Sequence, residues 1–392
     1  MNIAKFACLT SVASLALAVA GAARAEDQPA AAPAGPTALS TPAMSSSLSA
    51  NGNPFSVDTG PLGKIYFSGQ LTGLGTWQDH AVPGDNDKTK ADFSNAQIEI
   101  QKTDGLVQFY VQAGAYNFPS LGAAYVSSGR LTDATYKIVP VAFLKIVPNA
   151  NFNIMIGKLP TLIGAEYTFT FENLNIERGL LWNQEPAISR GVQANYTQGP
   201  LTVSGSWNDG YYSNHYSTGS GLISYVLNPK DTLAFVASGN FGKTSASRFV
   251  TPLAQNNGSI YNLIWTHTDG AWVINPYLQY TTTPKDLSLG LPGSASTFGG
   301  AVLVKYAFNP MFNLAGRAEY ISSSGSEVSL LYGPKSKAWS LTLTPTWQLK
   351  TFFVRGELSY TKLDSAAPGA GFGSLGDKTD QTRAMIETGV LF

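Results

Sequence analysis

Hydrophobic and polar residues alternate along most of the chain, beginning at Lys64. In the first such run Ile65, Phe67, Leu71 and Trp77 share one face, while Ser, Thr and Gln residues occupy the other. A period of two is typical of a β-strand, because successive side chains of a strand point in opposite directions. The same pattern recurs near 107–111, 201–207 and 339–347. The pattern therefore predicts an all-β protein.

Two kinds of connection separate the predicted strands, and they alternate. Seven are short and mostly contain turn residues, as at Asp104-Gly105, Gly199-Pro200 and Asn309-Pro310. Eight are long and rich in Gly, Ser, Asn and Asp, at about 78–92, 116–133, 160–188, 209–219, 241–258, 283–295, 323–335 and 363–380. Fifteen connections join sixteen strands. We therefore expect a transmembrane antiparallel β-barrel of about 16 strands, with short periplasmic turns and long extracellular loops, and not a soluble sandwich.

Aromatic residues support the same fold. Five aromatic pairs lie eight residues apart on the apolar face of their strand: Trp272/Tyr280, Phe298/Tyr306, Phe312/Tyr320, Trp339/Trp347 and Phe352/Tyr360. Eight residues of a tilted strand rise roughly 20 Å, close to the ~25 Å apolar band of a membrane barrel with an aromatic girdle at each edge. Both rings of each pair are expected to face lipid.

The composition narrows the function. Of 392 residues, 44% are hydrophobic and only 13% are charged, about half the charged share of an ordinary soluble domain. The formal net charge is zero, and removal of Lys5 and Arg24 with the first 25 residues leaves 23 basic and 25 acidic residues, a net charge of −2. This balance offers no electrostatic footprint for nucleic acid. The single cysteine, Cys8, lies in the segment expected to be removed, so no disulfide or cysteine metal site is expected.

The N-terminal region predicts export. Lys5, an apolar run from Phe6 to Ala20 and the small residues around Arg24 form a signal peptide over 1–25, cleaved after Ala25. A lipoprotein would need a cysteine at the end of the apolar run, whereas Cys8 lies at its beginning. Residues 26–60, rich in Ala, Pro and Ser, predict a flexible periplasmic linker before a barrel over 61–392. No later stretch approaches the roughly 18 apolar residues of a spanning helix.

Charged residues on the inward face of the last strands are candidate pore-lining residues. They are Arg317, Glu319, Arg355, Glu357, Arg383 and Glu387. Opposed charges on a pore wall create a transverse field that orients dipolar solutes and tunes ion preference. Alternatively, they pair across neighbouring strands and rigidify the wall. Both interpretations remain open at this stage.

The fourth predicted strand is apolar on both faces. Tyr136, Ala142 and Leu144 share one face, and Val141 and Phe143 share the other. An apolar face inside a watery pore needs a cover.

The long loop at 160–188 begins one strand later and is the candidate cover. It contains Glu166, Tyr167, Phe169, Phe171, Glu172, Glu177, Arg178, Trp182 and Glu185. We expect this loop to fold into the barrel, pack its aromatic residues on Val141 and Phe143, and narrow the pore with an acidic rim. An ordinary exposed loop is the alternative.

The C-terminal strand ends on Phe392 after an alternating run from Gln381. A terminal aromatic residue on such a strand resembles the signal that the outer-membrane barrel-assembly machinery reads. Phe392 is therefore a candidate assembly signal, and that machinery and outer-membrane lipid are expected partners.

Four segments carry a family resemblance. They are Gly157-Lys158-Leu159-Pro160-Thr161-Leu162-Ile163-Gly164, Arg317-Ala318-Glu319-Tyr320, Leu341-Thr342-Leu343-Thr344-Pro345 and Arg355-Gly356-Glu357-Leu358. With the signal peptide, they make residues 60–392 resemble the putative beta-barrel porin-2, OmpL-like family. The resemblance implies a Gram-negative outer-membrane porin and says little about its solute.

Other functions find little support in the sequence. A hydrolase would need a histidine near a nucleophile, but His80 and His215 lie in predicted outer loops and His267 lies beside an inner turn. No histidine pair has metal-ligand spacing, so neither a metal nor another cofactor is expected.

The sequence thus predicts a porin that passes small hydrophilic solutes by diffusion through a water-filled lumen, as a monomer or a homotrimer. A solute-specific channel, for example for sugars or organic acids, and a non-conducting structural barrel are the alternatives. Sixteen strands are enough to enclose an aqueous channel.

Overall fold

The computed structural model describes residues 47–85, 87–325 and 330–392. The predicted signal peptide, Cys8 and residues 26–46 of the predicted linker lie outside the described residues.

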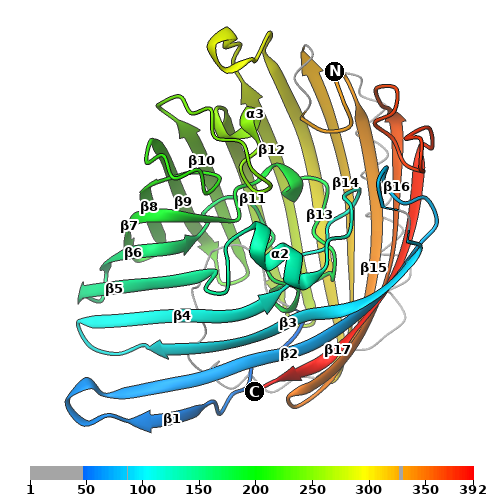
Figure 1. Cartoon of the computed structure of the whole chain (residues 1–392). Coiled ribbons are helices and arrows are strands. Elements are labelled where there is room, and N and C mark those ends of the chain that lie inside the picture. The colour runs from blue at the N-terminus through cyan, green and yellow to red at the C-terminus, as the bar shows by residue number, and fades with distance from the viewer. Residues whose placement is uncertain (1–46, 86, 326–329) are drawn as a thin grey trace.

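Sixteen strands, β2 to β17, form one closed antiparallel β-barrel, as predicted from the sequence. Each strand pairs with the next strand in chain order, and β17 pairs with β2, so the blue and red ends of the wall meet in Figure 1. The strands are β2 (Lys64–Gln78), β3 (Thr89–Lys102), β4 (Val107–Tyr116), β5 (Val141–Asn149), β6 (Phe152–Pro160), β7 (Ile188–Gln198), β8 (Leu201–Asn208), β9 (Thr218–Asn228), β10 (Asp231–Asn240), β11 (Ser259–Asp269), β12 (Trp272–Thr283), β13 (Ala295–Asn309), β14 (Phe312–Gly325), β15 (Lys337–Leu349), β16 (Phe352–Ser365) and β17 (Asp380–Leu391).

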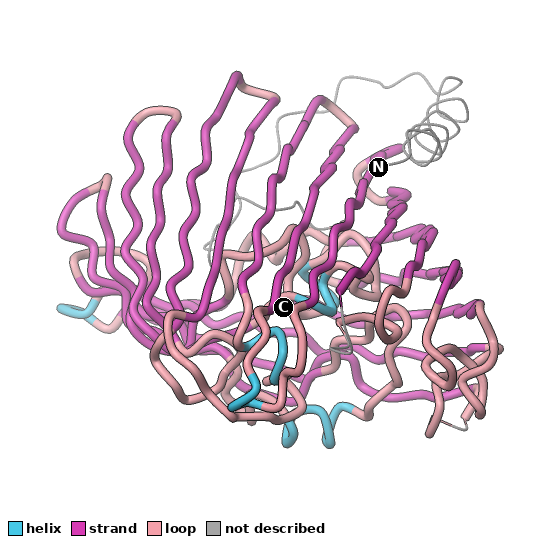
Figure 2. The backbone as a smooth tube through the Cα atoms, turned by 90° about the horizontal axis from the view of Figure 1, so that it is seen from above, coloured by secondary structure: helices cyan, strands magenta, loops and turns pink. Residues whose placement is uncertain are grey.

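Short and long connections lie at opposite ends of the barrel, which we call the short-turn end and the long-loop end. The short turns are 103–106, 150–151, 199–200, 229–230, 270–271, 310–311 and 350–351. The long connections include 117–140 with helix α2 (Ser128–Ala134), 241–258 with α3 (Leu253–Asn256), and 284–294 with the 3-10 turn η5 (Leu287–Leu289). Figure 2 shows short hairpin turns along one edge of the wall and most loops and helices at the other.

The longest connection is residues 161–187, here called the inner loop. It contains two 3-10 turns, η3 (Thr170–Glu172) and η4 (Trp182–Gln184). Among the described residues, no helix is both long and apolar enough to cross a membrane.

The alternation of each strand separates an outward apolar face from an inward face. On β15, Leu341, Leu343 and Trp347 are exposed, whereas Thr342 and Thr344 are buried on the inside. The paired aromatic residues lie on the outward face and touch across strands: ring centroids are 4.6 Å apart for Trp272/Tyr306, 5.5 Å for Trp339/Tyr360 and 6.1 Å for Trp347/Phe352.

The fourth barrel strand differs from its predicted form. It begins only at Val141, because Lys137 has a positive φ of 65° and Pro140 lacks an N–H for the strand ladder. Tyr136, predicted to face outward with Leu144, is instead 3% exposed and packs with the inward-facing Val141 and Phe143.

Residues 47–60, predicted as the end of a flexible linker, have a definite structure. The short strand β1 (Phe55–Asp58) pairs with Lys64–Phe67 of β2, across the 3-10 turn η2 (Gly60–Leu62). Ser47 and Leu48 are buried inside the barrel. The segment has too few apolar residues for its own core, and it is ordered by contacts with the barrel wall.

The C-terminus closes the barrel beside β1. The Phe392 N–H donates to the Gly69 carbonyl (2.9 Å), and the Gly69 N–H donates to the Phe392 carbonyl (2.8 Å). A Cβ atom at Gly69 would lie only 2.6 Å from the Phe392 ring, so the ring packs where glycine leaves space.

Candidate functional site: an inner loop bound to the barrel wall

The six predicted pore-lining charges lie between the barrel wall and the inner loop. All six point inward from β14, β16 and β17, as their alternation predicts, but none is more than 5% exposed. The inner loop covers them, so they contact protein groups and not an open lumen. Their geometry defines the candidate site.

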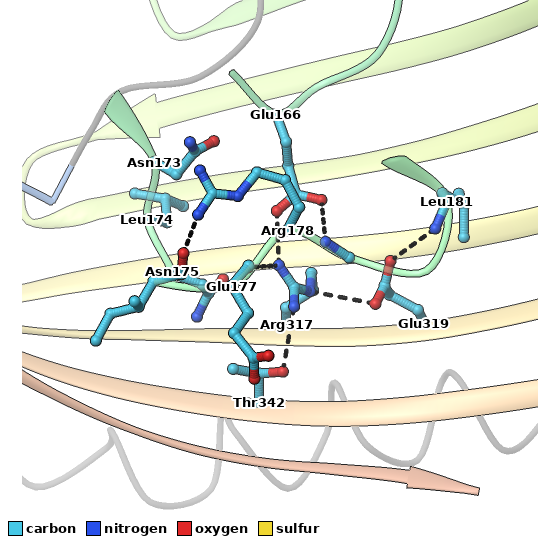
Figure 3. Close-up of polar contacts among 12 residues, drawn as sticks. Glu166, Asn173, Leu174, Asn175, Glu177, Arg178, Leu181, Arg317, Glu319 and Thr342 are labelled. Atoms are coloured by element: carbon cyan, nitrogen blue, oxygen red, sulfur yellow. Dashed lines mark hydrogen bonds and ion pairs between the residues drawn. The ribbon is translucent and has the colours of Figure 1, made fainter. Parts of the chain in front are cut away.

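Arg317 on β14 is the centre of the first group of contacts (Figure 3). Its guanidinium lies 2.6 Å from the Glu166 carboxylate and 3.2 Å from that of Glu319. It also donates a hydrogen bond to the Glu177 carbonyl (2.7 Å). One wall arginine thus binds both a side chain and the main chain of the inner loop.

The two carboxylates beside Arg317 accept hydrogen bonds from loop amides. Glu166 accepts from the Gly179 N–H (2.8 Å), and Glu319 accepts from the Leu180 N–H (3.1 Å). A Cβ atom on Gly179 would lie 2.1 Å from Oε1 of Glu319. With a larger residue at position 179, the loop or the Glu319 carboxylate would therefore have to move.

Glu357 and Arg355 on β16 hold the middle of the inner loop. Glu357 accepts hydrogen bonds from the N–H groups of Ile176 (2.5 Å) and Glu177 (2.8 Å). Arg355 pairs with Glu387 on β17 (2.6 Å) and donates to the Thr170 carbonyl (2.6 Å). The cross-strand pairing that the sequence left open therefore exists for Arg355 and Glu387, and the same arginine also binds the loop.

Arg383 on β17 joins the inner loop to the loop 117–140. It pairs with the Glu177 carboxylate and donates to the carbonyls of Ser120 (3.1 Å) and Ala123 (3.0 Å). Arg178, which is fully buried, donates to the Thr168 carbonyl (3.1 Å) within its own loop. Arg178 therefore stabilises the loop conformation and does not form part of an exposed rim.

These charged contacts hold the loop in one position. Removing one partner of a buried ion pair is strongly destabilising, because the other charge then stays in a low-dielectric environment without compensation. Two such pairs, Arg317–Glu166 and Arg383–Glu177, join the wall to the loop, so release of the loop requires both to break. The inner loop is thus a fixed part of the barrel interior.

Aromatic residues hold the opposite side of the inner loop. Phe169 and Trp182 belong to a buried cluster with Val141 and Phe143. Ring centroids are 5.3 Å apart for Tyr116/Phe169 and 5.6 Å for Phe118/Trp182. Tyr167 and Phe171 are partly buried at the edges of the core.

Two acidic residues of the loop have no ion pair in the described part of the chain. Glu172 accepts a hydrogen bond from the Phe169 N–H (3.0 Å), and burial, with a smaller contribution from the neighbouring Glu99, raises its pKa to about 8. Burial, with smaller contributions from Glu166 and Glu319, raises the pKa of Glu185 well above its ordinary value. Of the predicted acidic rim, Glu166 and Glu177 are thus paired with wall arginines, and burial disfavours the charged forms of Glu172 and Glu185.

Sequence reasoning missed a second apolar area on the inner wall. Leu222, Val236, Ile260, Ile264 and Leu303 face inward and form one buried cluster with leucine residues of the inner loop, among them Leu174, Leu180 and Leu181. Because these apolar residues lie on the otherwise polar, inward face of their strands, the sequence could have revealed this area. The loop leucines carried no such signal, because an irregular loop has no periodicity.

In the described part of the chain, no group of three or more His, Cys, Asp and Glu side chains is placed to hold a metal ion. His80 and His267 each lie beside an aspartate, at 3.1 Å from Asp380 and 2.8 Å from Asp231, near the ends of the barrel.

Comparisons with known proteins agree with this architecture. The sequence model of the family described as Putative beta-barrel porin-2, OmpL-like matches residues 64–392. No curated protein sequence matches the chain significantly.

Solved structures with the same fold include outer-membrane proteins and a porin. OmpT of Vibrio cholerae is 11% identical, with a TM-score of 0.56 and coverage of 87% of this chain and 100% of that chain. The anion-selective porin from Comamonas acidovorans is 10% identical, with a TM-score of 0.57 and coverage of 84% and 99%. The outer membrane channel DcaP of Acinetobacter baumannii is 10% identical, with a TM-score of 0.56 and coverage of 84% and 97%. At these identities the similarity concerns the fold alone.

Proposed function

The chain belongs to the Putative beta-barrel porin-2, OmpL-like family, and we propose that it is an outer-membrane channel through which small hydrophilic solutes diffuse down their gradients. The observation that carries the proposal is a long loop held inside a closed barrel and bound to one wall by buried ion pairs. A loop in this position narrows the pore from within the barrel and does not cover its mouth. The channel needs neither chemistry nor a cofactor.

We place the solute path between the inner loop and the wall of β7 to β9. Apart from Leu222, which packs on the inner loop, this wall presents small or neutral polar side chains, among them Gln193, Ser206, Asn208 and Ser220. These four residues and Thr161 of the inner loop border a cavity of about 10 Å³, which has room for about one water molecule. We therefore take this gap as the narrowest point of the proposed path.

In this arrangement the six wall charges act indirectly. Arg317, Arg355 and Arg383 hold the inner loop on one side and thereby set the width of the path on the other. The wall side of the path is lined by hydroxyl and amide groups, which favour neutral hydrophilic solutes. Specificity for one class of solute, such as sugars or organic acids, remains the alternative.

Cysteine modification tests the proposed path. The barrel contains no cysteine of its own, so Ser206→Cys introduces a single thiol on the inward face. Gly205→Cys is the matched control, because a Cβ at position 205 meets no atom within 4 Å and points outward from the same strand. We expect a charged methanethiosulfonate reagent to reduce the conductance of Ser206→Cys in a planar bilayer and to leave that of Gly205→Cys unchanged. Equal responses of two conducting variants would refute this path, and a folded protein that never conducts would support the structural-barrel alternative.

Assembly and maturation complete the proposal. The outward apolar faces would contact outer-membrane lipid or, in a homotrimer, a neighbouring subunit, and Phe392 would be read by the barrel-assembly machinery. Cleavage after Ala25 would make Glu26 the first residue of the mature protein. The intact mass of the protein purified from the outer membrane tests that cleavage directly.

A further inference from the structure

A short segment upstream of β1 lies inside the barrel near its short-turn end. The Ser47 hydroxyl donates to the Leu174 carbonyl of the inner loop (2.7 Å), and the Asn313 side chain of β14 donates to the Ser47 carbonyl (3.0 Å). Ser47 thus touches the inner loop on one side and the barrel wall on the other. It is only 6% exposed.

The next two residues continue this contact. Leu48 packs with Phe353 at the start of β16, Leu391 at the end of β17, and Phe171 of the inner loop. The Ser49 N–H donates to the Gln348 side chain (2.8 Å), and the Gln348 amide donates back to the Ser49 carbonyl (2.8 Å). This reciprocal pair fixes the segment in one register, as a strand pair would.

We propose that residues 47–49 form a strap that docks into the short-turn mouth beside the inner loop and narrows this mouth until the strap is released. The inference rests on the proposed channel function, since only a conducting barrel can be narrowed. The bound partner is a segment of this same chain.

The strength of the contacts explains why the strap can be released while the inner loop stays attached. The four hydrogen bonds of Ser47 and Ser49 described above join neutral groups, whose net contribution is small because water competes for them. The inner loop is held by buried ion pairs, which cost far more to break. The strap is therefore the weaker attachment and should leave first.

The position of β1 keeps the released strap near its site. Pairing of Phe55–Asp58 with β2 anchors the chain a few residues beyond Ser49, at the same end of the barrel. A short tether gives a high effective concentration of the strap at the mouth. Release and return can therefore be repeated.

Single-channel recording with a truncated protein tests the strap. We compare the full mature chain with a variant that lacks residues 26–50 and keeps β1. We expect the truncated channel to conduct severalfold more. A synthetic peptide of residues 44–53 should reduce that conductance when added on the short-turn side and not on the other, and the same peptide with Leu48→Asp should have no effect.

Point variants keep the test decisive if the truncated chain does not fold. Gln348→Ala removes the reciprocal pair with Ser49. Thr346→Ala is the matched control, because it changes the preceding inward position of β15, whose hydroxyl has no hydrogen-bond partner among the described residues. We expect Gln348→Ala alone to raise conductance. Full-length and altered channels that conduct equally would overturn the strap and leave the channel function intact, whereas folded barrels that do not conduct at all would overturn the channel function itself.

Discussion

The attachment of the inner loop to the wall can be tested at Arg317. In Arg317→Met, the apolar stem is approximately kept and the guanidinium is lost. Glu166 and Glu319 then remain buried without their cation, and the Glu177 carbonyl loses a donor. The barrel ladder around β14 is unchanged, so we expect local release of the inner loop and not unfolding of the barrel.

The size of the effect follows from the burial of this group. Removing one partner of a buried ion pair typically costs about 3–5 kcal/mol, and here both carboxylates and the arginine have no exposed side-chain surface. Because 1.4 kcal/mol corresponds to a factor of ten, the equilibrium for loop opening should rise roughly 100- to 4,000-fold.

Hydrogen exchange followed by mass spectrometry measures that equilibrium. The amides of Gly179 and Leu180 donate to the affected carboxylates, so peptides that cover 170–182 should exchange faster by this factor, while peptides of the β14 and β15 ladder should not change. Lys230→Met is the matched control, because the Lys230–Asp269 pair (2.9 Å) is about half exposed and is expected to contribute less than about 1 kcal/mol. Adding Glu166→Gln to Arg317→Met should restore part of the protection. Unchanged exchange in Arg317→Met would refute the claim that buried ion pairs hold the loop.

Three further predictions concern other parts of the barrel. Gly179→Ala should displace the inner loop, because the added Cβ would lie 2.1 Å from Glu319, and its exchange over 170–182 should exceed that of Gly205→Ala; equal exchange would contradict the close approach. Glu172 has a pKa raised from 4.5 to about 8, so its contribution to stability is present below about pH 4.5 and is lost as the pH rises through about 8; the midpoint of heat unfolding in detergent should fall over this range and fall less in Glu172→Gln, and parallel pH profiles would argue against this assignment. Deletion of Phe392 removes the main-chain pair with Gly69 and should lower the heat-modifiable folded fraction in the outer membrane several-fold; an unchanged fraction would exclude Phe392 as an assembly signal.

The strands could be predicted because their signals are local. Alternation with a period of two and turn residues such as Asp104-Gly105 depend only on neighbours in the sequence, and they located sixteen strands. The error at Tyr136 has the same origin. The apolar alternation extends upstream of Val141, where the strand begins, and includes Tyr136, although Lys137 between them has a positive φ.

The site was only partly predictable because its contacts are not local. The inward positions of Arg317, Arg355 and Arg383 followed from the alternation, and the aromatic and acidic residues of 160–188 made that loop a candidate. That these charges bind loop amides and carbonyls could not be predicted, because a main-chain group carries no sequence signal. Ser47 and Leu48 were missed for the same reason: the hydrogen bonds that hold Ser47 come from groups that lie more than 100 residues away in the chain.

The central claim is that this barrel is a diffusion channel narrowed by its inner loop, and conductance in a planar bilayer tests it most directly. The purified mature protein should give stepwise conductance in salt, and a variant lacking Tyr167 to Trp182 should give larger steps. A panel of sugars, amino acids and organic acids should leave the wild-type current without saturable block. A folded barrel that passes no current, or a deletion variant with steps of the same size, would contradict the claim.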